Sequence, residues 1–244
     1  MKIMHLITVF TVSSLFLIGC TEGPHRDVIA ITNVTVINAD RDNLDRQTVV
    51  FAEDQIISVE PTKREISNVS RVIDGTGKYL IPGLWDMHVH LTYDDAFTED
   101  MPSLFLAYGV TSVRDTGGLI HKIKPVIERM RAVDAISPRV YFSGPLLDGE
   151  FVVYDGGLVP EIGAKNSDIE MAEKTVSMLN KEGVDFIKIY EMVSPEVFTA
   201  LSEAASKYNL PIAAHVPLSM TASIAGPEVD SMEHLRNVES VSYT

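Results

Sequence analysis

The spacing of apolar residues changes near residue 80 and separates two kinds of expected structure. Before this point, runs rich in β-branched residues alternate with turn residues, which predicts strands over 28–38, 47–52, 55–59 and 71–74. Beyond it, short apolar runs alternate with helical stretches. We expect strands over 84–91, 111–115, 139–143, 185–190, 211–216 and 231–235, and helices over 99–108, 119–133, 168–182, 195–208 and 218–225.

Alternating strands and helices predict an α/β fold with a parallel sheet. Asp168 and Ser194 are suitable N-caps for two of the helices, and Gly109 and Gly183 stand where glycines end helices. The pace of the units is typical of a (β/α)₈ TIM-type barrel with about six of its eight units present. A doubly wound open sheet is the alternative, but no Gly-X-Gly-X-X-Gly follows the first strand. We expect a small β-sandwich over 28–80 and an incomplete barrel over 81–244.

The first residues have the pattern of an export signal. The stretch 7–18 is largely apolar and too short to span a bilayer comfortably. Leu17-Ile18-Gly19-Cys20 resembles the lipobox of bacterial lipoproteins, which implies a signal peptide over 1–19, lipidation of Cys20 and a tether over 20–27. The chain would then be exported and attached to a bacterial membrane only through its lipid. A plain signal peptide or a buried N-terminal strand are the alternatives.

Composition narrows the choice of partners. The formal net charge is −14 and no cluster of Lys and Arg is present, which argues against a nucleic-acid partner. Cys20 is the only cysteine, so an internal disulfide is excluded. Nothing in the sequence indicates an oligomeric state.

Several chemically capable side chains fall at the carboxyl ends of expected strands, where TIM barrels place their active sites. His88 and His90 end the first strand, and residues two apart in a strand share a face. His215 and His234 end two later strands. Chance explains the His88–His90 pair about as well as a metal site does when the pair is taken alone.

Lys188 lies between Ile187 and Ile189 in an expected buried strand. A buried lysine is costly, and burial lowers its pKa toward the neutral amine. That amine can be carboxylated by CO₂ to give an anionic ligand that bridges two metals. A lysine at the edge of the sheet is the alternative interpretation.

Four motifs in this order and spacing resemble the metal-dependent amidohydrolase superfamily, in its imidazolonepropionase-like and prolidase-like branch. They are Pro-Gly-Leu-Trp-Asp-Met-His-Val-His, Phe-Ile-Lys-Ile, Ala-His and Met-Glu-His-Leu. The resemblance implies that His88 and His90 bind one metal and that His215 and His234 bind a second. It implies that carboxylated Lys188 bridges the two, with Zn²⁺ the expected metal. The expected nucleophile is a hydroxide that bridges the metals.

The resemblance further implies hydrolysis of amide bonds in a dipeptide or another small molecule. A mononuclear site that hydrolyses or deaminates a cyclic amide is the second reading, and an inactive, truncated lipoprotein is the third. Arg114 and Tyr154 are candidate substrate contacts, although Arg114 and Asp115 also suit a structural ion pair. Asp86 receives no ligand role.

The family's general base is an aspartate at the end of the eighth barrel strand. Residues 235–244 contain no aspartate. We therefore expect either a fragment of a longer protein or a truncated product without activity.

Overall fold

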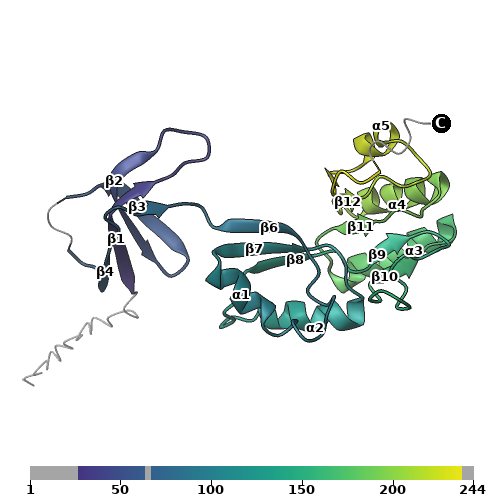
Figure 1. Cartoon of the computed structure of the whole chain (residues 1–244), viewed down its shortest axis with the longest axis horizontal. Coiled ribbons are helices and arrows are strands. Elements are labelled where there is room, and N and C mark those ends of the chain that lie inside the picture. Colours follow the sequence, from purple (N-terminus) through teal and green to yellow (C-terminus); the bar gives the residue numbers. More distant parts are fainter. Residues whose placement is uncertain (1–26, 64–66, 238–244) are drawn as a thin grey trace, which may run out of the picture. The chain divides into compact units, whose positions relative to one another are not determined.

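The computed structural model describes residues 27–63 and 67–237, and the expected export signal with Cys20 lies outside them (Figure 1). The chain divides into two compact units between Pro82 and Gly83. No helix in the described part is both long enough and apolar enough to cross a membrane.

The first unit is built from β-strands that pair in one sheet of order β3-β2-β1-β4, with β5 also paired to β1. Its strands are β1 (Val28–Val36), β2 (Leu44–Ala52), β3 (Gln55–Pro61), β4 (Arg71–Asp74) and β5 (Tyr79–Leu80). The three long strands are antiparallel neighbours, whereas β4 and β5 run parallel to β1. The described strands of this unit form a single sheet, and the sandwich over 28–80 stays a prediction.

The second unit alternates strands with helices, as the apolar pattern predicts. Its strands are β6 (Leu84–Val89), β7 (Val110–Asp115), β8 (Arg139–Phe142), β9 (Leu146–Asp148), β10 (Gly163–Lys165), β11 (Ile187–Ile189), β12 (Ile212–Ala214) and β13 (Ser231–Met232). Its helices are α1 (Met101–Ala107), α2 (Ile120–Met130), α3 (Ile169–Glu182), α4 (Pro195–Lys207) and α5 (Ala222–Ala225), followed by the short η1 (Gly226–Glu228). The neighbouring strands of this unit, β6 to β13, pair in parallel.

These strands form two sheets, of order β6-β7-β8 and β10-β9-β11-β12-β13, rather than a closed ring. A backbone hydrogen bond of 2.9 Å from Asp185 N to Phe142 O joins the strand regions of β8 and β11. Helix and sheet residues share one large apolar core, which includes Val113, Leu147 and Ile187. This parallel α/β arrangement agrees with the predicted fold class.

Local signals account for the helix boundaries. The Asp168 carboxylate accepts a 2.8 Å hydrogen bond from Met171 N at the start of α3. At the start of α4, the Ser194 hydroxyl accepts a 3.3 Å hydrogen bond from Val197 N. Gly183 ends α3 with φ of 78°, in the left-handed region that favours glycine. The strands β9 and β10 are not among the predicted strands, and they enclose a loop over 149–162.

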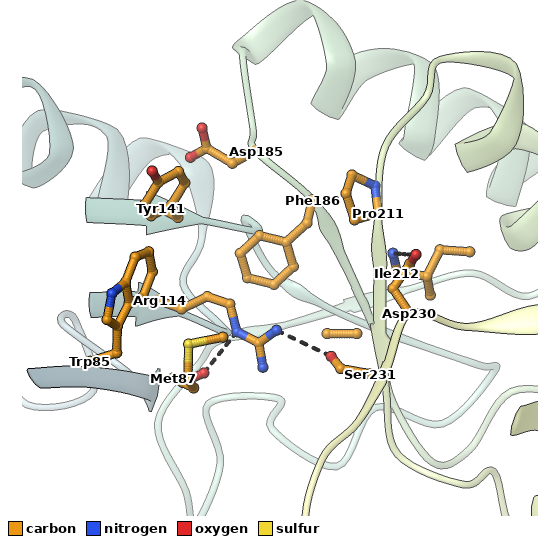
Figure 2. A pocket seen from close by; sticks show the side chains of 11 residues that line it. Trp85, Met87, Arg114, Tyr141, Asp185, Phe186, Pro211, Ile212, Asp230 and Ser231 are labelled. Atoms are coloured by element: carbon orange, nitrogen blue, oxygen red, sulfur yellow. Dashed lines mark hydrogen bonds between the residues drawn. The ribbon is translucent and has the colours of Figure 1, made fainter. Parts of the chain in front are cut away.

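A cavity of about 510 Å³ lies at the amino ends of the strands of the second unit (Figure 2). Trp85 stacks on Tyr141 on one side of it, with ring centroids 5.6 Å apart. Phe186 and Arg114 also line it. Arg114 and Ser231, which line this cavity, also hydrogen-bond to Glu233, the carboxylate beside His88.

Candidate functional site

The carboxyl ends of β6, β12 and β13 bring four histidines together. The ring centroid of His88 lies 5.2 Å from that of His90 and 4.5 Å from that of His234. The ring centroids of His234 and His215 lie 5.2 Å apart. The four imidazoles that the sequence singled out are therefore neighbours, although they come from segments far apart in the chain.

His88 and His90 each use Nδ1 to contact a hydrogen-bond acceptor. Nδ1 of His88 lies 2.7 Å from Glu233 Oε2, and Nδ1 of His90 lies 3.1 Å from the carbonyl oxygen of Gly117. Both partners only accept hydrogen bonds, so each Nδ1 carries the proton. In the neutral form of each ring, Nε2 then keeps its lone pair and can bind a metal.

Lys188 is fully buried, with 0% of its surface exposed, and its Nζ has no hydrogen-bond partner. It pairs with Ala213 of β12 and Leu146 of β9 in the sheet register. Burial, with a smaller effect of the Arg114 charge, lowers the pKa of its amine from 10.5 to about 7, against the opposing effect of Glu233. A substantial neutral fraction therefore exists near neutral pH, which is the nucleophilic form of the amine.

His215 is also buried, with 4% exposed, and its Nδ1 has no hydrogen-bond partner. Its nearest carboxylate oxygen, Glu191 Oε2, is 4.0 Å away. Burial lowers the pKa of His215 to about 3 and that of His90 to about 4, so both imidazoles are neutral at pH 7. His234 differs in being exposed and in having a backbone φ of 61°, a left-handed conformation that is unfavourable for histidine.

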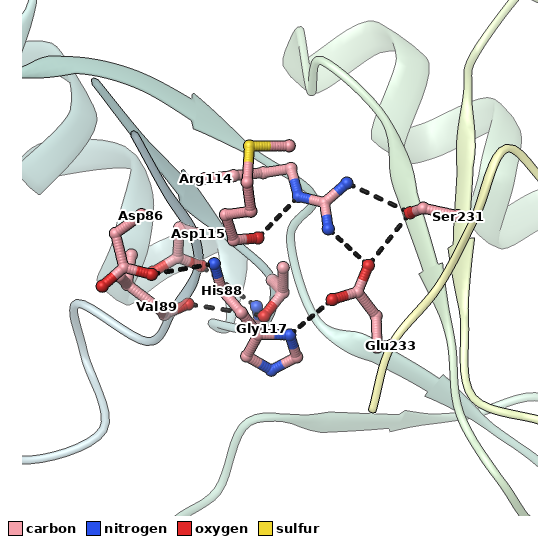
Figure 3. A network of polar contacts seen from close by, with 10 residues as sticks. Asp86, His88, Val89, Arg114, Asp115, Gly117, Ser231 and Glu233 are labelled. Carbon is pink, nitrogen blue, oxygen red and sulfur yellow. Dashed lines mark hydrogen bonds and ion pairs between the residues drawn. The ribbon is translucent and has the colours of Figure 1, made fainter. Parts of the chain in front are cut away.

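Arg114 and Glu233 form a polar network beside the histidines (Figure 3). The guanidinium donates through Nε to Met87 O at 2.7 Å, through Nη1 to Ser231 Oγ at 3.1 Å, and through Nη2 to Glu233 Oε1. Hydrogen bonding to His88 and the charges of Lys188 and Arg114 outweigh burial and lower the pKa of Glu233 to about 2. Arg114 therefore pairs with Glu233, not with Asp115.

Asp115 and Asp148 hold the loops around the site through backbone amides. Asp115 is fully buried and accepts hydrogen bonds from Leu91 N at 2.6 Å and Gly117 N at 3.1 Å. Asp148 is fully buried as well and accepts three such bonds, from Gly149, Val153 and Met192. Burial raises the pKa of both carboxyls, that of Asp115 to about 7. Asp86 accepts from His88 N at 3.1 Å.

Tyr154 lies in the loop between β9 and β10 and belongs to a circuit of aromatic rings around the site. Successive centroids lie 4.5 to 6.2 Å apart, and the pairs are His88–His90, His90–Tyr93, Tyr93–Tyr154, Tyr154–Tyr190, Tyr190–His215, His215–His234 and His234–His88. Tyr93, Tyr154 and Tyr190 connect His90 to His215 along one half of this circuit, and the histidines make up the other half. Sequence reasoning singled out Tyr154 but missed Tyr93 and Tyr190.

The donor chemistry suits a divalent cation. Neutral imidazoles with free ring nitrogens and a buried, unpartnered amine are the groups from which a Zn²⁺ site with a carboxylated lysine is built. Within residues 27–63 and 67–237, no three His, Cys, Asp or Glu side chains are already arranged to hold a metal ion.

Gly117 is the point at which a small change should disturb His90. A Cβ atom at Gly117 would lie 2.9 Å from His90 Nδ1 and 3.0 Å from Leu146 Cδ2. We expect Gly117→Ala to displace the ring and weaken Zn²⁺ binding by about 10-fold, the lower end of the usual loss when the support of a ligand is disturbed. Competition with a chelating dye measures this, and Gly157→Ala, in the exposed loop, is the matched control. An unchanged affinity would show that His90 does not bind the metal.

The structure resembles those of several hydrolases. A presumed prolidase from Bifidobacterium longum is 25% identical, with a TM-score of 0.71 over 86% of this chain and 55% of that one. A Xaa-Pro dipeptidase with methionine bound in its active site is 18% identical, with a TM-score of 0.73 over 85% and 61%. A bottromycin amidohydrolase is 24% identical, with a TM-score of 0.65 over 88% and 44%. The chain thus spans about half the length of these proteins.

A comparison with curated proteins found no match. The model of the amidohydrolase family matches residues 79–241, a range that contains the four histidines and Lys188. Because this match covers well over half of the sequence and begins where the strand–helix alternation begins, the chain belongs to the amidohydrolase family.

Proposed function

We propose that this chain carries the metal centre of a hydrolase that cleaves amide bonds in dipeptides or other small N-acyl compounds. The observation that supports this best is the unpartnered amine of Lys188, buried beside neutral imidazoles. A buried amine without a hydrogen bond is destabilising, so its presence calls for a chemical role. Family membership and the similarity to a dipeptidase and an amidohydrolase support the class of reaction.

His88 and His90 would hold one cation through Nε2, and His215 and His234 would hold a second. Lys188 would join the two sites after its Nζ attacks CO₂, forming an N–C bond and releasing a proton to leave a carbamate. Divalent cations bound there would supply a hydroxide nucleophile at neutral pH and polarise the scissile carbonyl. Tyr93 and Tyr154 would offer aromatic faces to the substrate, while Asp115 and Asp148 hold the loops that carry them.

Activity of the full-length protein tests this proposal. The Zn²⁺-loaded protein should hydrolyse members of a panel of dipeptides and N-acyl amino acids, and should contain about two metals per chain. One metal per chain together with turnover of a cyclic amide would favour the mononuclear alternative. Absence of turnover on both panels in a folded, metal-loaded protein would leave the inactive lipoprotein as the better reading. Lipidation at Cys20 and export also remain proposals, which mass analysis of the mature N-terminus would check.

A further inference from the structure

We propose that Glu233 is a positioning residue that fixes the tautomer of His88 and so keeps its Nε2 available as a metal ligand. This inference rests on the metal centre proposed above. Glu233 follows β13, directly before His234, and its side chain reaches across to His88 on β6 (Figure 3). Glu233 would therefore position His88, not His234, its neighbour in sequence.

The contact defines which ring nitrogen of His88 carries the proton. Oε2 of Glu233 lies 2.7 Å from His88 Nδ1, and a carboxylate can only accept. In the neutral ring the proton therefore sits on Nδ1, which leaves the lone pair on Nε2. His90 reaches the same state through the Gly117 carbonyl oxygen, an acceptor that no side-chain change can remove. His88 alone in this pair depends on a side chain that can be replaced.

The other oxygen of Glu233 is held from two directions. Oε1 accepts from Arg114 Nη2 and from Ser231 Oγ, the latter at 2.9 Å. Arg114 is itself fixed to Met87 O through Nε, at 2.7 Å. With only 7% of Glu233 exposed, the carboxylate has little freedom to rotate away from His88. Arg114 thus contributes to the site by holding Glu233 in place.

Glu233→Gln tests the proposal because an amide offers one acceptor where the carboxylate offers two. Arg114 has only donors, so it should claim the amide oxygen and turn the amide NH₂ toward His88. His88 Nδ1 would then have to accept, which moves its proton to Nε2 and blocks the ligand. We expect Zn²⁺ affinity to fall by about 10- to 100-fold, as is usual when a hydrogen-bond partner of a metal ligand is lost.

The tautomer is measured in the metal-free, full-length protein from the ¹⁵N chemical shifts of the His88 ring. The shifts should report a proton on Nδ1 in the wild type and on Nε2 in Glu233→Gln. Glu182→Gln is the matched control, because Glu182 forms a 2.6 Å ion pair with Lys124 elsewhere in the unit. It should change neither the tautomer nor the Zn²⁺ affinity.

A double variant separates positioning from damage to the fold. In Arg114→Met/Glu233→Gln no guanidinium competes for the amide oxygen, so the oxygen can face His88, and most of the lost Zn²⁺ affinity should return. Two results would overturn the proposal. One is a proton on Nε2 of His88 in the wild-type protein, and the other is a Zn²⁺ affinity of Glu233→Gln within about twofold of wild type. A folded double variant that binds Zn²⁺ no better than Glu233→Gln would refute the role of Arg114. If no amide substrate reacts while the tautomer and affinity still shift, the proposed function fails and the positioning role stands.

Discussion

Replacement of Lys188 with methionine should abolish amide hydrolysis and leave the folded protein at least as stable as before. Methionine fills a similar volume but cannot form a carbamate. We expect the rate to fall by at least about 10³-fold, since the loss of an electrostatic group at a metal centre costs about 4 kcal/mol of transition-state stabilisation. Stability should not fall, because the buried Nζ has no hydrogen bond to lose.

The pH dependence of stability gives a second readout for Lys188. Its pKa is about 7 in the folded, metal-free protein and 10.5 as the unperturbed value. Between these pH values the unfolded chain binds a proton that the folded chain does not, so the free energy of unfolding should rise with pH, by up to about 1.4 kcal/mol per unit. Denaturant titrations from pH 7 to 10 should show this rise in the wild type and not in Lys188→Met.

Lys124→Met is the matched control for both measurements, because Lys124 forms a partly exposed ion pair with Glu182. It should leave the rate unchanged. Full turnover by Lys188→Met would contradict a bridging role for Lys188. A large loss of stability in Lys188→Met would show that the Lys188 amine has a hydrogen-bond partner in solution.

Removal of divalent metal by a chelator should also abolish turnover and should lower the melting temperature. A ligand present at about 1,000 times its Kd stabilises the folded state by about 4 kcal/mol, which is worth roughly 8–16 °C for a domain of this size. Adding Zn²⁺ back should restore both properties. Scanning calorimetry and an activity assay on the same samples make the test.

The pH response of metal binding follows from the histidines. His90 and His215 have pKa values lowered to about 4 and about 3, so protons should compete poorly for these two ligands above pH 5. Zn²⁺ should therefore stay bound down to lower pH than at sites with ordinary histidines.

In the chelator experiment, a metal-free protein that keeps its activity would contradict the metal-dependent mechanism.

The sequence allowed the proximity of the four histidines to be predicted because their signal is local. A histidine or lysine within an apolar run reveals both its strand and its face, and the order of the units then places His88, Lys188 and His215 at one end of a parallel sheet. Helix boundaries at Asp168 and Gly183 follow from capping chemistry in the same local way.

The supporting contacts could not be predicted, because they depend on which segments meet in three dimensions. Nothing near Glu233 in sequence indicates that its carboxylate faces His88, which lies 145 positions away. Likewise, β9 and β10 are only three residues each, too short to leave a periodic pattern. The hydrogen bond from Met192 N to Asp148 becomes visible only once β9 and β11 are adjacent.

The left-handed backbone at His234 sets the stability of the fold against the proposed metal site at a single position. Holding a non-glycine residue at a φ of 61° costs on the order of 1 kcal/mol, and the exposed ring recovers little of it by packing. Glycine there would relax the turn and give a sturdier protein without one of its four imidazoles. A search for thermostable variants that ignores activity should therefore find this position early. If the proposed metal site is correct, a gene no longer selected for activity should lose it through a change that improves the fold.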